Sequence, residues 1–254
     1  MVKKSKKAKV VKVPAKAKGA LAIPQKDKTA YGKKADKEEA KTIQKTALKR
    51  NWAIVTDNCY GVAYMKAYNK PYESPFFSMY ILAPDYILLL KHFTRFMLSK
   101  PRIQKPEGKT RYYKGRERKY PVLLLKTKWG EVEIHFAHEK GGAKEALKKW
   151  ESRKSRMGAT YTDAEKAKDV AEGKKGYNNM FVKMDDRDQF TAKLGKEFLA
   201  MDKFPNKVLF VSQKWKKEFE GMDNVVITPY KSSGPIGTKL EKEYPIPARA
   251  NIPI

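Results

Sequence analysis

The residues that can do chemistry gather in a few short segments, one of them around the chain's single cysteine. Asn58 and Cys59 follow an apolar run that predicts a strand, and α/β folds place their sites at such strand ends. In chain order, Cys59, then His135 or His138, and then Asp188 would supply a thiol nucleophile, its base and an orienting carboxylate. The alternative is that Cys59 is merely a small buried side chain, because free cysteine is among the most buried residue types.

Two nearby histidines, His135 and His138, raise the possibility of a metal site. A strand would place residues three apart on opposite faces, so a shared ion requires a turn between them. The carboxylates of Asp57, Asp185, Asp186 and Asp188 could complete such a site, but no tight metal-ligand signature is present. We therefore expect no bound metal. We also expect no cofactor, because the sequence has neither a Walker-type phosphate loop nor a dinucleotide fingerprint.

The acidic segment Asp185-Asp186-Arg187-Asp188 has two interpretations. Acidic clusters of this kind can hold a divalent ion together with a sugar nucleotide. Aspartate is also favoured at helix N-caps, and a helix is predicted from near Gln189. Of the two interpretations, we favour the helix cap.

Basic charge is the chain's dominant compositional feature, and it is spread unevenly. The 254 residues carry 56 Lys and Arg against 28 Asp and Glu, a net charge of +28. Residues 1–35 are rich in Lys, Ala and Pro, have no apolar period, and predict a basic arm that attracts polyanions. Its polyanion-binding candidates are Lys3, Lys4, Lys6, Lys7 and Lys9.

Residues 100–119 predict a second basic segment, a loop in which aromatic residues alternate with cations. Cations can neutralise phosphates there while tyrosines stack on bases. The alternative is a solvated basic loop without a partner. No motif for sequence-specific nucleic-acid recognition occurs. The candidate residues are Arg111, Tyr112, Tyr113, Arg116 and Arg118.

Several protein classes are excluded by composition. With 41% hydrophobic residues the chain can bury a core, and one cysteine cannot build a disulfide scaffold. No apolar run is long enough to span a membrane, and the N-terminus lacks the apolar stretch of a secretory signal. We therefore expect no transmembrane segment and a location in a virion or inside a cell.

The elements that must position these residues alternate between strands and helices, which predicts an α/β fold with one mixed sheet flanked by helices. We expect a single domain over residues 36–230, with a basic loop at 100–119 and a surface insertion at 157–177, then an extended Pro-containing tail at 231–254. Helices are expected at 36–48, 85–98, 143–156 and 190–201. Strands are expected at 52–56, 76–82, 122–125, 132–136, 179–184, 208–211 and 225–228.

Four ordered segments carry a family resemblance: residues 54–61 (IVTDNCYG), 71–76 (PYESPF), 133–138 (EIHFAH) running into Trp150 and Arg153, and 178–188 (NNMFVKMDDRD). Together they resemble the "domain of unknown function 1919" family over roughly residues 38–230. Its bacterial members are often labelled exopolysaccharide biosynthesis proteins. The resemblance implies an α/β fold and no established reaction. Tyr60 stands where the family usually has Trp, and the basic segments look like additions.

These observations lead to three functional hypotheses. The first is a non-catalytic structural or binding protein that docks through its basic segments into a large assembly, such as a virus particle, where it would be a minor capsid or virion component, or a nucleoprotein. The second, implied by the resemblance, is a transferase-like enzyme of exopolysaccharide or glycan biosynthesis at the carboxyl edge of the sheet. The third is a nucleic-acid-binding protein without sequence specificity.

Overall fold

The structure, a computed structural model, describes residues 53–67, 74–105, 107–115, 117–157, 177, 180–231 and 237–244. The predicted basic arm, the helix expected at 36–48 and nearly all of the predicted insertion at 157–177 lie outside these ranges, as does Arg116. The structure therefore concerns the α/β part of the chain.

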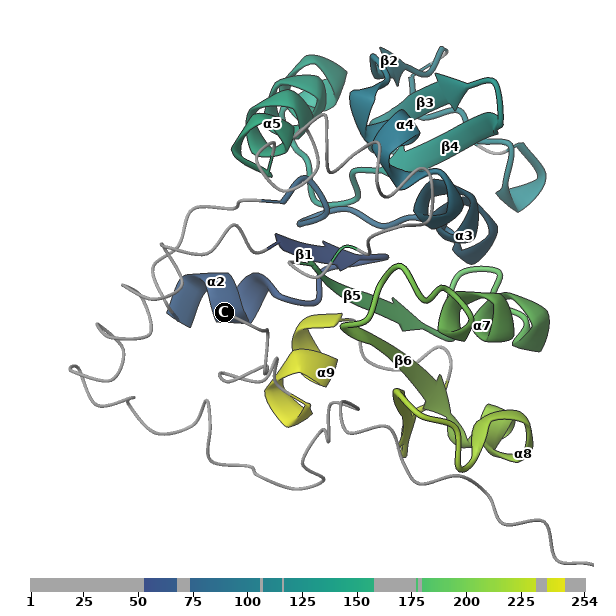
Figure 1. Cartoon of the computed structure of the whole chain (residues 1–254). Helices are drawn as coiled ribbons and strands as arrows, with labels where there is room; N and C mark the ends of the chain where they lie inside the picture. The colour runs from purple at the N-terminus through teal and green to yellow at the C-terminus, as the bar shows by residue number, and fades with distance from the viewer. Residues whose placement is uncertain are drawn as a thin grey trace, which may run out of the picture.

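A four-stranded parallel sheet forms the centre of the fold (Figure 1). Its strands are β1 (Ala53–Thr56), β5 (Met180–Asp185), β6 (Lys207–Ser212) and β7 (Val225–Thr228), and they lie in that order. β1, β5 and β6 are buried at every position, as expected for parallel strands that are covered on both faces.

Alternate residues of the parallel sheet face two different layers of helices. Val55 and Val182 belong to the larger core, which includes side chains of α3 (Ala83–Lys91) and α7 (Ala192–Leu199). Ile54 and Phe181 face a smaller core, to which α2 (Val62–Ala67) and α9 (Gly237–Glu243) contribute. Helix α9 lies in the segment that the sequence predicted to be extended. Leu240 is buried against the sheet, and burial of this apolar side chain holds the short helix in place.

The remaining strands form a separate three-stranded antiparallel sheet. It consists of β2 (Arg102–Ile103), β3 (Val122–Thr127) and β4 (Gly130–His135), with β3 in the middle. Helices α4 (Phe93–Leu98) and α5 (Gly142–Met157) pack on it. The predicted α/β class and the β3–β4 hairpin are confirmed, but the strands divide between two sheets and do not form one mixed sheet.

Two predicted elements differ from the structure in ways that shape the site. The apolar run at 76–82 is not a strand: only Tyr80 pairs with β4, and Ser78 has a φ of 62°. The helix predicted at 85–98 divides into α3 and α4 at His92, whose φ and ψ are −122° and 38°. Burial explains the first misassignment, because a buried connection is as apolar as a strand.

The other regular elements are short. Helix α8 (Lys216–Phe219) follows the 3₁₀ turn η3 (Gln213–Trp215), and a further 3₁₀ turn, η1 (Tyr113–Gly115), lies in the basic loop. Across the part of the chain that the structure describes, none of the helices combines the length and the apolar character that crossing a bilayer requires.

Candidate functional site

The parallel strands end at one edge of the sheet, and this carboxyl edge gathers polar residues. Asp57 and Asn58 follow β1, Asp185 is the last residue of β5, and Asp186 comes directly after it. Because β1 and β5 are parallel neighbours, with Thr56 paired to Lys183, these residues lie together. All four are buried, with at most 8% of their surface exposed.

Lys183 lies at the centre of this group, on the face of β5 that carries Phe181. Its side chain is completely buried. The Nζ atom lies 2.9 Å from Asp57 Oδ1, 3.0 Å from Asn58 Oδ1 and 2.6 Å from Asp185 Oδ2. One ammonium group therefore joins two carboxyl groups that are 128 residues apart in sequence. We call Asp57, Asn58, Lys183 and Asp185 the edge cluster.

Further hydrogen bonds fix the geometry of the edge cluster. The backbone N–H of Asp185 donates to Asp57 Oδ2 at 2.9 Å, and Asn58 Nδ2 donates to Asp185 Oδ2 at 2.6 Å. One buried oxygen, Asp185 Oδ1, accepts no hydrogen bond from any described residue. A buried carboxylate oxygen without a partner is costly, so this atom is available to a hydrogen-bond donor of a ligand.

The electrostatics of the edge cluster favour proton exchange near neutral pH. Burial, reinforced by the charge of Asp185, raises the pKa of Asp57 to about 7, although Lys183 opposes the shift. Burial alone would lower the pKa of Lys183, but Asp185 and Asp57 outweigh it and raise that pKa. The cluster thus combines a carboxyl group that titrates near neutral pH with a cation that stays charged.

Helix α9 covers one side of the edge cluster. A Cβ atom added to Gly237 would lie 2.2 Å from the backbone nitrogen of Tyr60 and 2.3 Å from Asn58 Oδ1. The ring centroid of Tyr60 lies 5.7 Å from Lys183 Nζ, and its hydroxyl donates to the carbonyl of Tyr244. Glycine is required at position 237 because the helix approaches the site so closely.

The predicted triad residues all lie near this edge, but they have different neighbours. Cys59 is 8% exposed. Burial raises the pKa of its thiol, and the charges acting on it are those of Lys183 and Asp57. Asp188 interacts with Asp185, Arg187, His135 and Lys183, and burial raises its pKa. The structure thus places His135 close enough to Asp188 to interact with it. The triad itself remains a prediction.

His135 is completely buried and lacks the hydrogen bonds expected of a base. Its ring stacks on Tyr80 with centroids 4.7 Å apart, and Nε2 lies 3.4 Å from Glu133 Oε2. His138, by contrast, is exposed in the turn after β4. Among the residues that the structure describes, no three His, Cys, Asp or Glu side chains lie close enough to hold a metal ion.

The preferred interpretation of residues 185–188 as a helix cap is wrong. The N-cap of α7 is Thr191, whose side chain accepts a hydrogen bond from the backbone N–H of Leu194. Asp186 instead accepts hydrogen bonds from the N–H and the hydroxyl of Ser212, at the end of β6. Asp186 therefore ties the ends of β5 and β6 together, and the segment does not cap a helix.

The aromatic and basic residues of the 100–119 loop make internal contacts. Arg111 and Tyr112 both donate to Asp85 Oδ1, and Asp85 Oδ2 accepts the backbone N–H of Glu133 at 2.7 Å. The side chain of Glu133 accepts from Thr110 and from the N–H of Arg111. We call Asp85, Thr110, Arg111, Tyr112 and Glu133 the hairpin network, because it fastens the loop to β4.

Two other candidates of that loop are also engaged. The guanidinium carbon of Arg118 lies 3.7 Å from the ring centroid of Tyr113. Polyanion binding by Arg111, Tyr112, Tyr113 and Arg118 remains a prediction. The candidates Lys3, Lys4, Lys6, Lys7, Lys9 and Arg116 lie outside the described residues.

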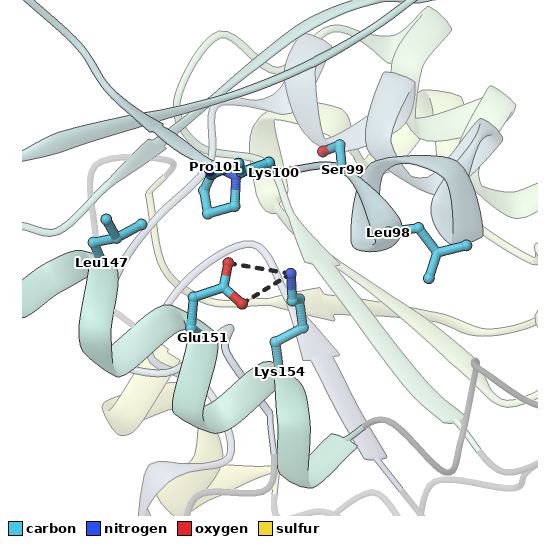
Figure 2. Close-up of a pocket in the computed structure, with 7 residues that line it drawn as sticks. All are labelled: Leu98, Ser99, Lys100, Pro101, Leu147, Glu151 and Lys154. Carbon is cyan, nitrogen blue, oxygen red and sulfur yellow. Dashed lines mark hydrogen bonds and ion pairs between the residues drawn. The ribbon is translucent and has the colours of Figure 1, made fainter.

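A cavity of about 370 Å³ lies elsewhere, between the end of α4 and the outer face of α5 (Figure 2). Residues 98–101 line it together with Leu147, Glu151 and Lys154. Glu151 and Lys154 form an ion pair across one turn of α5, with 3.0 Å between Oε2 and Nζ. No residue of the edge cluster lines this cavity, so it is separate from the candidate site.

Fold and site together describe an α/β protein with buried, charged groups at the carboxyl edge of a parallel sheet. The family model "Domain of unknown function (DUF1919)" matches residues 31–243, so the chain belongs to this family. A search of curated proteins found no match to the chain.

Sequence reasoning missed the central residue of the site, Lys183. The only signal was a lysine within the otherwise apolar run Met180-Phe-Val-Lys-Met, and a lysine is rarely buried without a partner. Two aspartates at predicted strand ends, Asp57 and Asp185, could have suggested that partner.

Proposed function

We propose that the chain is a transferase-like enzyme whose reaction takes place at the edge cluster, with Asp57 as the proton acceptor. The observation that carries this proposal is the pKa of about 7 at Asp57, beside a fully buried lysine. Groups that titrate near neutral pH and are shifted by burial and a specific charge are characteristic of catalytic sites. Activated sugars are the substrate class that the exopolysaccharide label of bacterial family members suggests.

In this proposal an acceptor hydroxyl attacks the anomeric carbon of an activated sugar. The new C–O bond forms as the bond to the leaving phosphate oxygen breaks, and the hydroxyl proton passes to the carboxylate of Asp57. Lys183 keeps Asp57 oriented through the 2.9 Å contact and lowers the free energy of its charged form. The positive charge that Lys183 supplies is fixed before substrate arrives, as electrostatic preorganisation requires.

The test is turnover of a panel of sugar nucleotides by the full chain, measured as nucleotide release. We expect Asp57→Asn to lower the rate by at least about 100-fold, the usual scale for loss of a general base. The matched control is Asp85→Asn, which removes an equally buried carboxylate from the hairpin network and should leave turnover in place. No turnover by the wild type with any activated sugar, or full activity of Asp57→Asn, would refute the proposal.

A second function is favoured by a separate observation, the net charge of +28 and its concentration in the first 50 residues. In this proposal the basic segments dock the domain into a large assembly, a virus particle or a nucleoprotein, and the protein resides in a virion or inside a cell. Such docking is electrostatic, so it weakens as added salt shortens the screening length from about 8 Å to about 3 Å.

Sedimentation of the native assembly at physiological and at molar salt tests the docking proposal. Co-migration with a large particle at low salt, lost at high salt and in a chain lacking residues 1–35, is the expected result. The truncated chain should melt at an unchanged temperature. Retention that depends neither on salt nor on residues 1–35 would contradict docking through the arm.

A further inference from the structure

Trp129 occupies an unusual place for a large aromatic side chain. It lies in the two-residue turn of the β3–β4 hairpin, where Thr127 pairs with Gly130, and 37% of its surface is exposed. Turn positions normally carry small or polar residues, and burial of Trp129 does not contribute to the core. A partly exposed aromatic ring outside the hydrophobic core is a feature of binding surfaces.

The ring of Trp129 is nevertheless held in position by the break between α3 and α4. His92, the residue at that break, stacks on Trp129 with ring centroids 4.8 Å apart and planes 18° apart. Burial, together with the charges of Lys203 and Lys91, lowers the pKa of His92, which favours its uncharged ring. The two rings form a preordered platform that keeps one aromatic ring exposed at the surface.

Cations surround this platform. The Arg95 guanidinium carbon lies 5.9 Å and the Lys128 Nζ lies 4.6 Å from the Trp129 ring centroid. Lys91 is paired with Glu197 at 2.7 Å, and Lys203 donates to the carbonyl of Lys91. Within the described ranges, neither Arg95 nor Lys128 has an acidic partner within 4.0 Å. Their charges are thus available to a ligand.

We infer that this Trp129 surface, made of His92, Arg95, Lys128 and Trp129, binds single-stranded nucleic acid. The exposed part of the indole offers an aromatic contact to a base, and the guanidinium and ammonium groups that lie over its ring, which no described carboxylate pairs, fit the phosphates on either side. Duplex DNA or RNA would not fit, because its bases are already stacked on one another. The surface is independent of the edge cluster and uses none of the tyrosines of the 100–119 loop.

The experiment is binding of a fluorescein-labelled oligo(dT) of about 20 nucleotides to the full chain, followed by anisotropy over a range of salt concentrations. Trp129→Ala should weaken binding about fivefold or more, the scale of one lost base stack, whereas Trp129→Phe should retain most of the affinity. The double variant Arg95→Gln, Lys128→Gln should reduce the slope of log K against log salt by about 1.4, since each single-strand phosphate contact contributes about 0.7.

The matched control is a second lysine–tryptophan pair on the same molecule. Lys214 Nζ lies 4.5 Å from the ring centroid of Trp215, which is half-buried and packs edge-on against Phe190. The variant Lys214→Gln, Lys217→Gln removes the same charge and should leave the slope nearly unchanged.

Two results would overturn the inference. The first is a result that assigns binding to other basic segments. Either Trp129→Ala binds oligo(dT) as tightly as wild type, or the two double variants have the same slope of log K against log salt. The second is equal or tighter binding of polyglutamate with the same dependence on Trp129, which would make this an acidic-peptide site. Circular dichroism of each variant verifies the fold, and the charge variants keep the test valid if Trp129→Ala is unstable.

Discussion

The edge cluster and the hairpin network are both buried groups of carboxylates around a cation, but their atoms are satisfied to different degrees. In the hairpin network, both oxygens of Asp85 and of Glu133 accept hydrogen bonds. Its cation, Arg111, keeps 38% of its side chain exposed. In the edge cluster the lysine is wholly buried, and Asp185 Oδ1 has no partner among the described residues.

The pKa values of the carboxyl groups also differ between the hairpin network and the edge cluster. Burial acts against the charged form of Glu133, but the neighbouring His135 and the hydrogen bonds from Thr110 and Arg111 outweigh it and lower its pKa. At Asp57 burial prevails, and the pKa rises to about 7. A fully bonded network fastens a loop, whereas an incompletely bonded one keeps a group that can exchange a proton.

Substitution of the buried Lys183 should have the largest effect on the free energy of unfolding. Lys183→Met leaves two carboxyl groups buried without a cation and should lower the free energy of unfolding by about 3–5 kcal/mol in urea denaturation. Arg111→Met, the counterpart in the hairpin network, should cost only about 1 kcal/mol because solvent screens the partly exposed Arg111. Equal losses would remove the distinction between the two networks.

The pH dependence of stability should be the next largest effect. The pKa of Asp57 is 3.8 as a reference and about 7 in the folded protein. Between these values the folded state binds more protons than the unfolded state, so stability decreases as pH rises. From pH 5 to 8 the loss should be at most about 3 kcal/mol, since each pKa unit corresponds to about 1.4 kcal/mol.

Comparison of urea midpoints of wild type and Asp57→Asn at both pH values isolates this contribution. Between pH 5 and pH 8 the urea midpoint of Asp57→Asn should fall less than that of wild type. The amide of the variant does not titrate, and all other titratable groups are the same in the two proteins. An identical decline in the two proteins would mean that Asp57 has an ordinary pKa.

Gly237→Ala should perturb the edge cluster through α9. The added methyl group would overlap Tyr60 and Asn58, and overpacking of this kind costs about 1–3 kcal/mol. The chain's single cysteine gives a clean readout, since displacement of α9 should speed the reaction of Cys59 with a disulfide reagent. Gly195→Ala, which meets Phe190 and Phe219 at 2.6 Å, should destabilise without changing that rate. Equal rates in both variants would show that α9 does not protect the site.

The smallest effect concerns the hairpin network. Tyr112→Phe removes the hydroxyl that donates to Asp85 and should cost about 1 kcal/mol in unfolding free energy. Urea denaturation of wild type and Tyr112→Phe measures this loss. An unchanged free energy of unfolding would show that the hydroxyl of Tyr112 does not fasten the loop.

The sequence predicts much of the fold because apolar runs bounded by turn residues identify strands locally. Residues 225–228 form β7 with the predicted bounds, and β1 and β6 differ from prediction by a residue or two. The run at 76–82 failed because burial alone does not distinguish a strand from a buried connection, and backbone pairing reaches only Tyr80.

Part of the candidate site could also be predicted from the sequence. Asn58, Cys59 and the aspartates after β5 were placed at strand ends by their position after apolar runs, and the parallel arrangement brings them to one edge. Lys183 was not, because its buried state depends on partners that the chain supplies from more than 120 residues away.

By itself, then, the sequence determined the class of fold, the concentration of basic charge in the first 50 residues, and the location of polar residues at strand ends. These features depend on composition and short-range periodicity. Only the tertiary structure decided that Lys183 is buried between Asp57 and Asp185, that Tyr112 is bonded within the protein, and that Trp129 is exposed. The reason is physical: the pKa, bonding and exposure of a side chain depend on neighbours that long-range packing alone brings together.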